Sequence, residues 1–180
     1  MFYNVTLKTD IRVPPSELKR NIEEVVHERL IQNFESFISQ EIGYIISIDK
    51  INTIGEGIII PEDGAAYYET EFTALIFKPE LQEVVFGKVT DITNFGAFIN
   101  MGPIEGMVHI SQTMDDFVSF SKSGALIGKD SKRTLKLNDK CKARIIAISF
   151  KDVTTPKIGL TMRQPGLGAL QYLEDKKRKK

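Results

Sequence analysis

Hydrophobic and polar residues alternate with a period of two in three short runs near the middle of the chain. The runs are Val85–Ile92, Phe95–Ile99 and Met107–Ile110, and β-branched residues in such a pattern predict strands. Gly87 and Gly96 fall inside these runs, where glycine indicates a bulge or a tight bend. Three short, curved, consecutive strands are typical of the opening half of a small closed barrel.

Two later runs predict the remaining strands of this barrel. Lys140–Ser149 and Lys157–Met162 again alternate apolar and polar positions, which predicts a fourth and a fifth strand. The intervening segment, Gln112–Asn138, combines scattered aromatic residues with the basic side chains of Lys129, Lys132, Arg133 and Lys136. It is either a basic extended segment beside the barrel or a solvated hairpin, and the sequence leaves both open.

The first half of the chain has a different pattern. Met1–Thr9 alternates as a strand, and the apolar spacing from about Ser16 to Phe37 predicts an amphipathic helix of about five turns that Pro14 and Pro15 open. Tyr44–Ile54 and Ala65–Phe77 predict two further strands. We therefore expect an α+β chain, in which an N-terminal antiparallel sheet with one packed helix precedes an all-β barrel.

The distribution of charge also divides the chain in two. Formal net charge is zero, but residues 1–80 hold 7 Lys and Arg against 14 Asp and Glu, whereas residues 81–180 hold 17 against 10. A basic half suggests a polyanionic partner, and an acidic half suggests a different one. We expect an N-terminal docking domain at 1–80 and a nucleic-acid-binding domain at 81–180, joined directly at Lys78–Glu80. The basic Lys176–Lys180 run indicates a solvated tail, or an additional attraction for nucleic acid.

The segment Ile54–Gly64 is rich in glycine and ends in a Pro-Glu-Asp-Gly turn, which predicts a hairpin-like tip. A phosphate cradle is disfavoured because no Lys-Ser or Lys-Thr pair follows the glycines and no helix starts there. A plain turn and a docking loop both remain open. Ile58, Ile59 and Ile60 favour docking, because a two-sided sheet cannot bury three successive side chains and an exposed apolar tip is typical of a partner site.

The barrel residues resemble the S-one RNA-binding domain, a five-stranded OB barrel. The resemblance is carried by Val85-x-Gly87-x-Val89-x-x-Ile92-x-x-Phe95-Gly96-Ala97-Phe98-Ile99 and by Gly106-Met107-Val108-His109-Ile110-Ser111. It implies RNA contacts from the aromatic residues of the second strand, from the histidine that ends the third, and from flanking basic residues. The implied RNA-binding residues are Lys88, Phe95, Phe98, His109, Lys142, Arg144, Lys157 and Arg163.

The residues themselves leave alternatives at this face. An OB face binds single strands by stacking bases on exposed aromatic rings beside basic side chains. Phe95 and Phe98 are three positions apart, so a regular strand would turn only one of them outward unless a bulge at Gly96 exposes both. Burial of each ring inside the barrel, and a structural role for His109, remain the competing interpretations.

Nearly the whole chain resembles the larger stalk subunit of the archaeal and eukaryotic multisubunit RNA polymerases. Members of this family are called E-prime in archaea and the seventh subunit of the second polymerase in eukaryotes. The resemblance is carried by Ile54–Tyr68, Phe77–Glu80 and Ile158–Gly168. It implies that the tip docks on the polymerase core beside the clamp, through Gly55, Gly57, Ile59, Ile60, Pro61, Asp63 and Gly64.

The same resemblance implies two more partners. The small stalk subunit would pack along both domains as a heterodimer, and the barrel would contact the emerging single-stranded RNA to support initiation, elongation and termination. The expected location is the cytoplasm, beside the nucleoid, in an archaeon and the nucleus in a eukaryote.

The sequence offers no support for catalysis, a cofactor or a membrane span. His27 and His109 fall in different halves, and no nucleophile–base pair or metal cluster is visible. Cys141 is the only cysteine, so an internal disulfide is excluded. No run of ~18 apolar residues occurs. A translation or RNA-processing factor with the same barrel remains an alternative, as does, less favourably, a nuclease with an accessory barrel.

Overall fold

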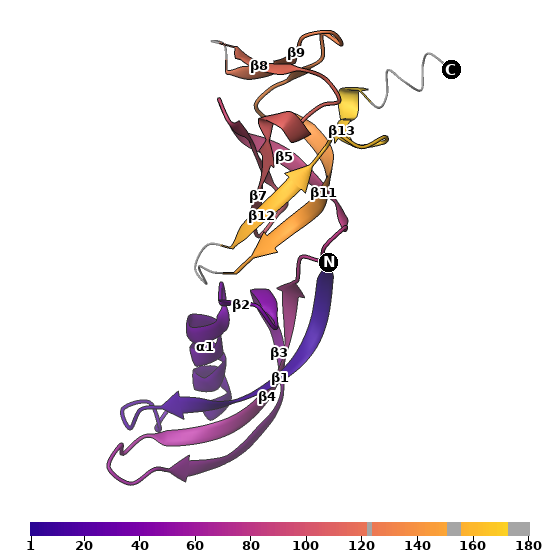
Figure 1. The fold of residues 1–180 in the computed structure, drawn as a ribbon. Helices are drawn as coiled ribbons and strands as arrows, with labels where there is room; N and C mark the ends of the chain where they lie inside the picture. The colour runs from indigo at the N-terminus through magenta and orange to yellow at the C-terminus, as the bar shows by residue number, and fades with distance from the viewer. Residues whose placement is uncertain (122–123, 151–155, 173–180) are drawn as a thin grey trace. The chain divides into compact units, whose positions relative to one another are not determined.

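A computed structural model describes residues 1–121, 124–150 and 156–172 of the chain (Figure 1). Two compact units make up the fold, Met1–Lys78 and Pro79–Lys180. The first is an antiparallel sheet with one helix and the second is a closed five-stranded barrel with a small additional sheet. The α+β fold class predicted from the sequence is therefore confirmed.

The first unit is a four-stranded antiparallel sheet with the order β1-β4-β3-β2. Its strands are β1 (Phe2–Val13), β2 (Ile38–Ser39), β3 (Gly43–Ile59) and β4 (Ala66–Phe77). Helix α1 (Ile22–Phe34) packs on one face, as Figure 1 shows. The buried core between helix and sheet consists of Ile11, Val13, Val25, Val26, Leu30, Ile45, Ile48, Phe72, Ala74 and Ile76. Alternate strand positions supply the sheet side of this core because side chains alternate between faces.

Helix α1 is shorter than the predicted helix from Ser16 to Phe37. It begins after Asn21, whose side-chain oxygen accepts a hydrogen bond from the backbone N–H of Glu23 at 3.0 Å. Such a cap satisfies an amide that has no partner inside the helix. Pro14 and Pro15 follow the end of β1, but they do not open α1, so the prediction that they start the helix was wrong.

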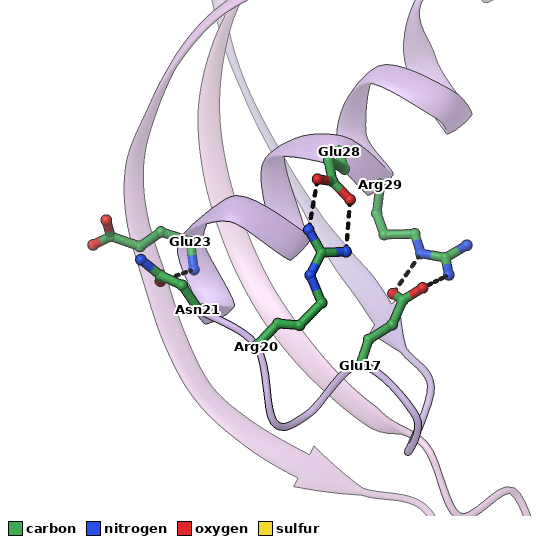
Figure 2. A network of polar contacts seen from close by, with 6 residues as sticks. All are labelled: Glu17, Arg20, Asn21, Glu23, Glu28 and Arg29. Carbon is green, nitrogen blue, oxygen red and sulfur yellow. Dashed lines mark hydrogen bonds and ion pairs between the residues drawn. The ribbon is translucent and has the colours of Figure 1, made fainter.

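Ion pairs hold the connection before α1 against the helix surface (Figure 2). Glu17 lies 2.6 Å from Arg29, and Arg20 lies 2.7 Å from Glu28. Leu18 still packs against the core although it lies outside the helix. The apolar spacing around Leu18 therefore predicted its burial correctly, but it did not predict its secondary structure.

The β3–β4 hairpin extends further than predicted, and its turn is correspondingly shorter. Backbone pairing continues to Ile59 opposite Ala66, with a register shift between Ile54 and Gly57. Gly55 and Gly57, predicted to lie in a loop, are part of β3. A Cβ on Gly57 would come within 2.7 Å of the Tyr68 ring, so a larger residue there would require the Tyr68 side chain to move.

The second unit is built on five barrel strands. They are β5 (Val84–Thr93), β6 (Gly96–Asn100), β7 (Glu105–His109), β11 (Lys140–Ser149) and β12 (Lys157–Thr161). The barrel closes because β12 pairs with β11 in an antiparallel sense and with β7 in a parallel sense. A Cβ on Gly96 would lie 2.1 Å from the carbonyl oxygen of Val108, so the close approach of β6 and β7 requires glycine.

The segment between β7 and β11 is neither an extended segment nor a simple hairpin. It starts with the 3-10 helix η1 (Ile110–Gln112) and then forms a separate sheet of β8 (Val118–Ser121), β9 (Ala125–Gly128) and β10 (Thr134–Leu135). Asp116 fixes the turn after β9, because its carboxylate accepts hydrogen bonds from the backbone N–H and hydroxyl of Ser131 at 2.8 and 2.7 Å. These bonds stabilise the charged carboxylate and lower the pKa of Asp116 to about 2.

The end of the described chain adds one more short strand. Strand β13 (Gly168–Ala169) pairs with Cys141 and Lys142 of β11, and residues 170–172 after it are helical. The basic Lys176–Lys180 run lies outside the described residues. Among the described residues, no helix has both the length and the apolar composition that a membrane crossing requires.

Candidate nucleic-acid and docking surfaces

Phe95 and Phe98 form an aromatic pair on the barrel. Their ring centroids lie 6.2 Å apart with an interplanar angle of 88°, an edge-to-face geometry that aromatic rings favour. Phe95 is 47% exposed and Phe98 is half-buried. Phe95 lies in the turn immediately before β6, so strand alternation does not force the two rings apart. The pair leaves aromatic surface open to a flat ligand.

His109 joins this aromatic pair on the outer face. Strand pairing places Met107 opposite Phe98 and His109 opposite Gly96, and opposite residues of an antiparallel pair share a face. The Nδ1 of His109 accepts a hydrogen bond from the Ser111 backbone N–H at 3.3 Å. In the neutral ring Nε2 is then the donor, which suits contact with a phosphate or a base edge. We call Phe95, Phe98 and His109 the aromatic face.

The predicted phosphate-binding residues are spread over the barrel, and Lys88, paired with Asn100, comes within two positions of Phe98 in register. Lys88 and Lys142 lie on the stretch where β5 pairs with β11. Arg144, also on β11, is half-buried, and its Nε has no hydrogen-bond partner in the described structure. Lys157 is the first residue of β12, and Arg163 follows two residues after its end. The basic residues therefore occupy several places on the barrel surface.

Arg163 faces the additional sheet rather than the aromatic face. It forms an ion pair with Asp115 at 3.1 Å, and both residues line a cavity of about 490 Å³ between η1 and β8. Asp116 and Asp130 line the same cavity. The surplus of carboxylates makes this cavity a poor site for a phosphate group.

The turn between β3 and β4 is held by a polar cluster centred on Asp63. Its carboxylate accepts hydrogen bonds from Arg12 Nε at 2.9 Å and from the Tyr67 hydroxyl at 2.5 Å. The guanidinium and the hydroxyl stabilise the ionised carboxylate, so the pKa of Asp63 is well below its usual range. The cluster ties the turn to β1 and β4 and so restricts its conformation.

The apolar side chains of this turn have no cover within the described structure. Ile58, Ile59 and Ile60 are 67%, 64% and 46% exposed, and Pro61 and Gly64 are exposed as well. From here on we use the word tip for residues 58–64, the part of the predicted Ile54–Gly64 segment that follows Gly55 and Gly57. Three adjacent exposed isoleucines on a restrained turn form an apolar projection of the kind that marks a partner site.

Comparisons with known proteins give a family match for each of the two units. Residues 8–64 match the SHS2 domain found in the N terminus of Rpb7p, Rpc25p and MJ0397, and residues 78–163 match the S1 RNA binding domain. The DNA-directed RNA polymerase subunit Rpo7 of Sulfolobus acidocaldarius is 38% identical over 96% of this chain and 95% of its own length. The chain belongs to the Rpo7 family of DNA-directed RNA polymerase subunits. The family resemblance inferred from the sequence is confirmed.

Other members of the Rpo7 family extend the comparison. Rpo7 of Saccharolobus solfataricus is 36% identical over 99% of this chain and all of its own length. The DNA-directed RNA polymerase II subunit 7 of Arabidopsis thaliana is 25% identical over 94% of this chain and 97% of its own. The similarity therefore covers both units.

Two further observations bear on chemistry. Burial raises the pKa of the Cys141 thiol to about 12, so this side chain is a core residue rather than a nucleophile. In the part of the chain that the structure describes, no group of three or more His, Cys, Asp or Glu residues is arranged to hold a metal ion.

Sequence reasoning missed Phe86. This ring is 65% exposed on β5, between the buried Val85 and the half-buried Gly87, and Lys142 Nζ lies 5.4 Å from its centroid. The exposure of Phe86 could have been predicted from the alternation along β5, because a strand with Val85 and Val89 inside must turn Phe86 outward.

Proposed function

We propose that this Rpo7 family member is a non-catalytic component of a DNA-directed RNA polymerase that docks on the polymerase core through the tip. The observation that carries the proposal is the run of three exposed isoleucines on a turn restrained by Asp63. A restrained projection loses little conformational entropy when it binds, and burial of its apolar side chains supplies a driving force. The polymerase subunits among its relatives supply the identity of the partner.

The second part of the proposal concerns RNA. The aromatic face offers exposed rings for stacking, and the S1 match covers all the barrel strands. Stacking tolerates any base because every base has a flat π surface. We therefore propose that the barrel binds the emerging single-stranded transcript with weak sequence preference, and that it supports initiation, elongation and termination in this way.

The third part concerns the small stalk subunit. Each unit carries exposed apolar side chains that a protein partner would cover, such as Phe2 and Phe37 in the first unit and Leu81 in the second. We propose a heterodimer with the small stalk subunit, in the archaeal cytoplasm beside the nucleoid or in a eukaryotic nucleus. Co-expression with this partner should raise the soluble yield of the chain, and equal yields without it would argue against an obligate pair.

A non-catalytic role is supported by the distribution of reactive groups within the described residues. His27 lies on α1, His109 lies on the barrel, and Cys141 is buried. No metal-binding cluster accompanies them in that part of the chain. A reaction centre needs such groups to converge at one site.

Affinity capture tests the central proposal. The purified chain is used as bait in an extract of the source cells, and captured proteins are identified by mass spectrometry. The large polymerase subunits should be recovered, and Ile59→Asp with Pro61→Asp should abolish their recovery, because a charge cannot be buried in an apolar socket without a partner. Ile146→Asp, which places the same charge at an exposed isoleucine of β11, is the matched control. Recovery of ribosomal or exosome subunits in place of polymerase would overturn the proposal and favour a translation or RNA-processing role.

A further inference from the structure

The outer face of β5 and β11 carries an exposed aromatic ring among cations. Strand pairing sets Lys142 opposite Phe86 and Lys140 opposite Lys88, and opposite residues share a face. All four side chains therefore point away from the barrel interior. Phe86 is 65% exposed and Lys142 Nζ lies 5.4 Å from the centre of its ring. Arg144 occupies the next outward position of β11 and is half-buried.

In register, Lys88 of β5 comes close to the aromatic face, because it is paired with Asn100, two positions after Phe98. The residues paired with Phe98 are Asp91 and Met107, and Thr93 and His109 are paired with Gly96. The carboxylate of Asp91 repels a phosphate group at this position. Lys88 and the lysines beside it on β11 are therefore the cations that can neutralise the phosphates of a nucleic-acid strand whose bases stack there.

Strand β5 connects Phe86 to the residue that is paired with Phe98 of the aromatic face. Phe86 precedes Asp91, the residue opposite Phe98, by five positions on β5, or about 16 Å of extended chain. Alternate positions such as Lys140 and Lys142 are about 6.6 Å apart, comparable to the separation of successive phosphates in an extended single strand. A ring flanked by lysines at this spacing matches the way proteins bind single-stranded nucleic acid without reading its sequence.

We propose that Phe86 with Lys88, Lys140 and Lys142 forms a second contact site for single-stranded RNA, distinct from the aromatic face. A base stacks on the Phe86 ring and the lysines contact the phosphates on either side of it. The exposed cation–π contact between Lys142 and Phe86 is weak enough to be exchanged for a base. This inference rests on the proposed RNA binding by the barrel and adds a second platform to it.

Oligonucleotide length provides the test. Oligouridylates of about 4 and about 12 nucleotides, which span the usual range of OB-fold site sizes, are titrated against the full chain by fluorescence anisotropy. Phe86→Ala should weaken binding of the long oligonucleotide about tenfold, which corresponds to ~1.4 kcal/mol. It should leave the short one, held by the aromatic face, within about twofold of wild type. Phe86→Tyr keeps the ring and should restore the affinity.

Salt dependence separates the lysines from the ring. Lys142→Gln should reduce the slope of log K against log salt by about 0.7 for the long oligonucleotide, the contribution of one phosphate contact on a single strand. Phe86→Ala should leave the slope unchanged. Phe120→Ala and Lys50→Gln remove an exposed ring and an exposed lysine elsewhere, and serve as controls that should not alter binding.

The outcomes distinguish this inference from the function on which it rests. If the wild-type chain binds both lengths and Phe98→Ala weakens both, but Phe86→Ala changes neither, the second site is refuted while RNA binding stands. Equal losses with Phe86→Ala and Phe120→Ala also refute it. If neither oligonucleotide binds the wild-type chain, RNA binding by the barrel fails, and the Phe86 site fails with it.

Discussion

Truncating the tip isoleucines one at a time measures how much of the tip becomes buried on the polymerase core. Moving a whole isoleucine side chain from water to a protein interior is worth about 1.5–3 kcal/mol. Ile58 and Ile59 are 67% and 64% exposed, so about two thirds of that free energy, or ~1–2 kcal/mol each, is still to be gained on docking. Ile58→Ala or Ile59→Ala should therefore raise the Kd for the core roughly 5- to 30-fold.

The assay is a titration of the fluorescently labelled chain with polymerase core that lacks this subunit. Because all three tip isoleucines are exposed, their truncation should not change the melting temperature of the chain. Ile146→Ala is the matched control, because it shortens an isoleucine that is 40% exposed on β11 and lies outside the tip. Its Kd should stay within about twofold of wild type, a change of ~0.4 kcal/mol.

The pattern of losses also reports the shape of the socket. Ile58 pairs with Tyr67 and Ile59 pairs with Ala66, so the two isoleucines point to opposite faces of the hairpin. Similar losses at both would mean that the core encloses the tip, and a loss at only one would mean that it covers a single face. If neither truncation, nor Ile60→Ala, raises the Kd more than the control does, the tip is not buried on docking and the reasoning from its exposure is wrong.

Three further predictions follow from contacts within the units. Asp63→Asn removes the charge that Arg12 and the Tyr67 hydroxyl stabilise, so it should weaken docking in the same core titration with little change in melting temperature; unchanged docking would show that the turn does not need this restraint. Gly96→Ala should destabilise the barrel by roughly 2–3 kcal/mol in urea unfolding, because the new Cβ meets the Val108 carbonyl oxygen at 2.1 Å; wild-type stability would contradict the close approach of β6 and β7. The pKa of Asp116 is lowered to about 2, so its ionised carboxylate stabilises the fold fully above the ordinary pKa of about 4. This stabilisation is lost as the pH falls toward 2. A carboxyl NMR titration should place the midpoint near 2, whereas a midpoint near 4 would mean that Ser131 does not bind the carboxylate.

The five barrel strands and the three long strands of the first unit could be predicted because their cause is local. Alternation of apolar and polar residues depends only on neighbours in sequence, and it located all the barrel strands to within a few residues. The start of α1 could not be found in this way. Asn21 caps the helix, while Leu18 is half-buried without being helical. The ion pairs Glu17–Arg29 and Arg20–Glu28 hold the connection, and they join residues that only the fold brings together.

The candidate sites were predictable to different degrees. The exposed tip isoleucines could be inferred because no two-sided sheet buries three successive side chains, although β3 proved to extend through Gly55 and Gly57. The meeting of Phe95 with Phe98 depends on where β6 begins, which periodicity does not fix to a single residue. The grouping of Lys142 with Phe86 depends on the register between β5 and β11. The sequence of either strand alone does not determine that register.

The parallel pairing of β7 with β12 has a consequence for how the chain folds during synthesis. Gly106 pairs with Ile158, and the whole additional sheet lies between them in the sequence, so the barrel cannot close until β12 has been synthesised. The first unit, in contrast, has its last strand at Phe77 and can fold as soon as that residue leaves the ribosome. Contacts between residues far apart in sequence form slowly because the loop between them must first be closed. During synthesis the barrel therefore passes through a stage in which the edge of β7 that will pair with β12 is open to aggregation. The N-terminal unit can already be native at this stage.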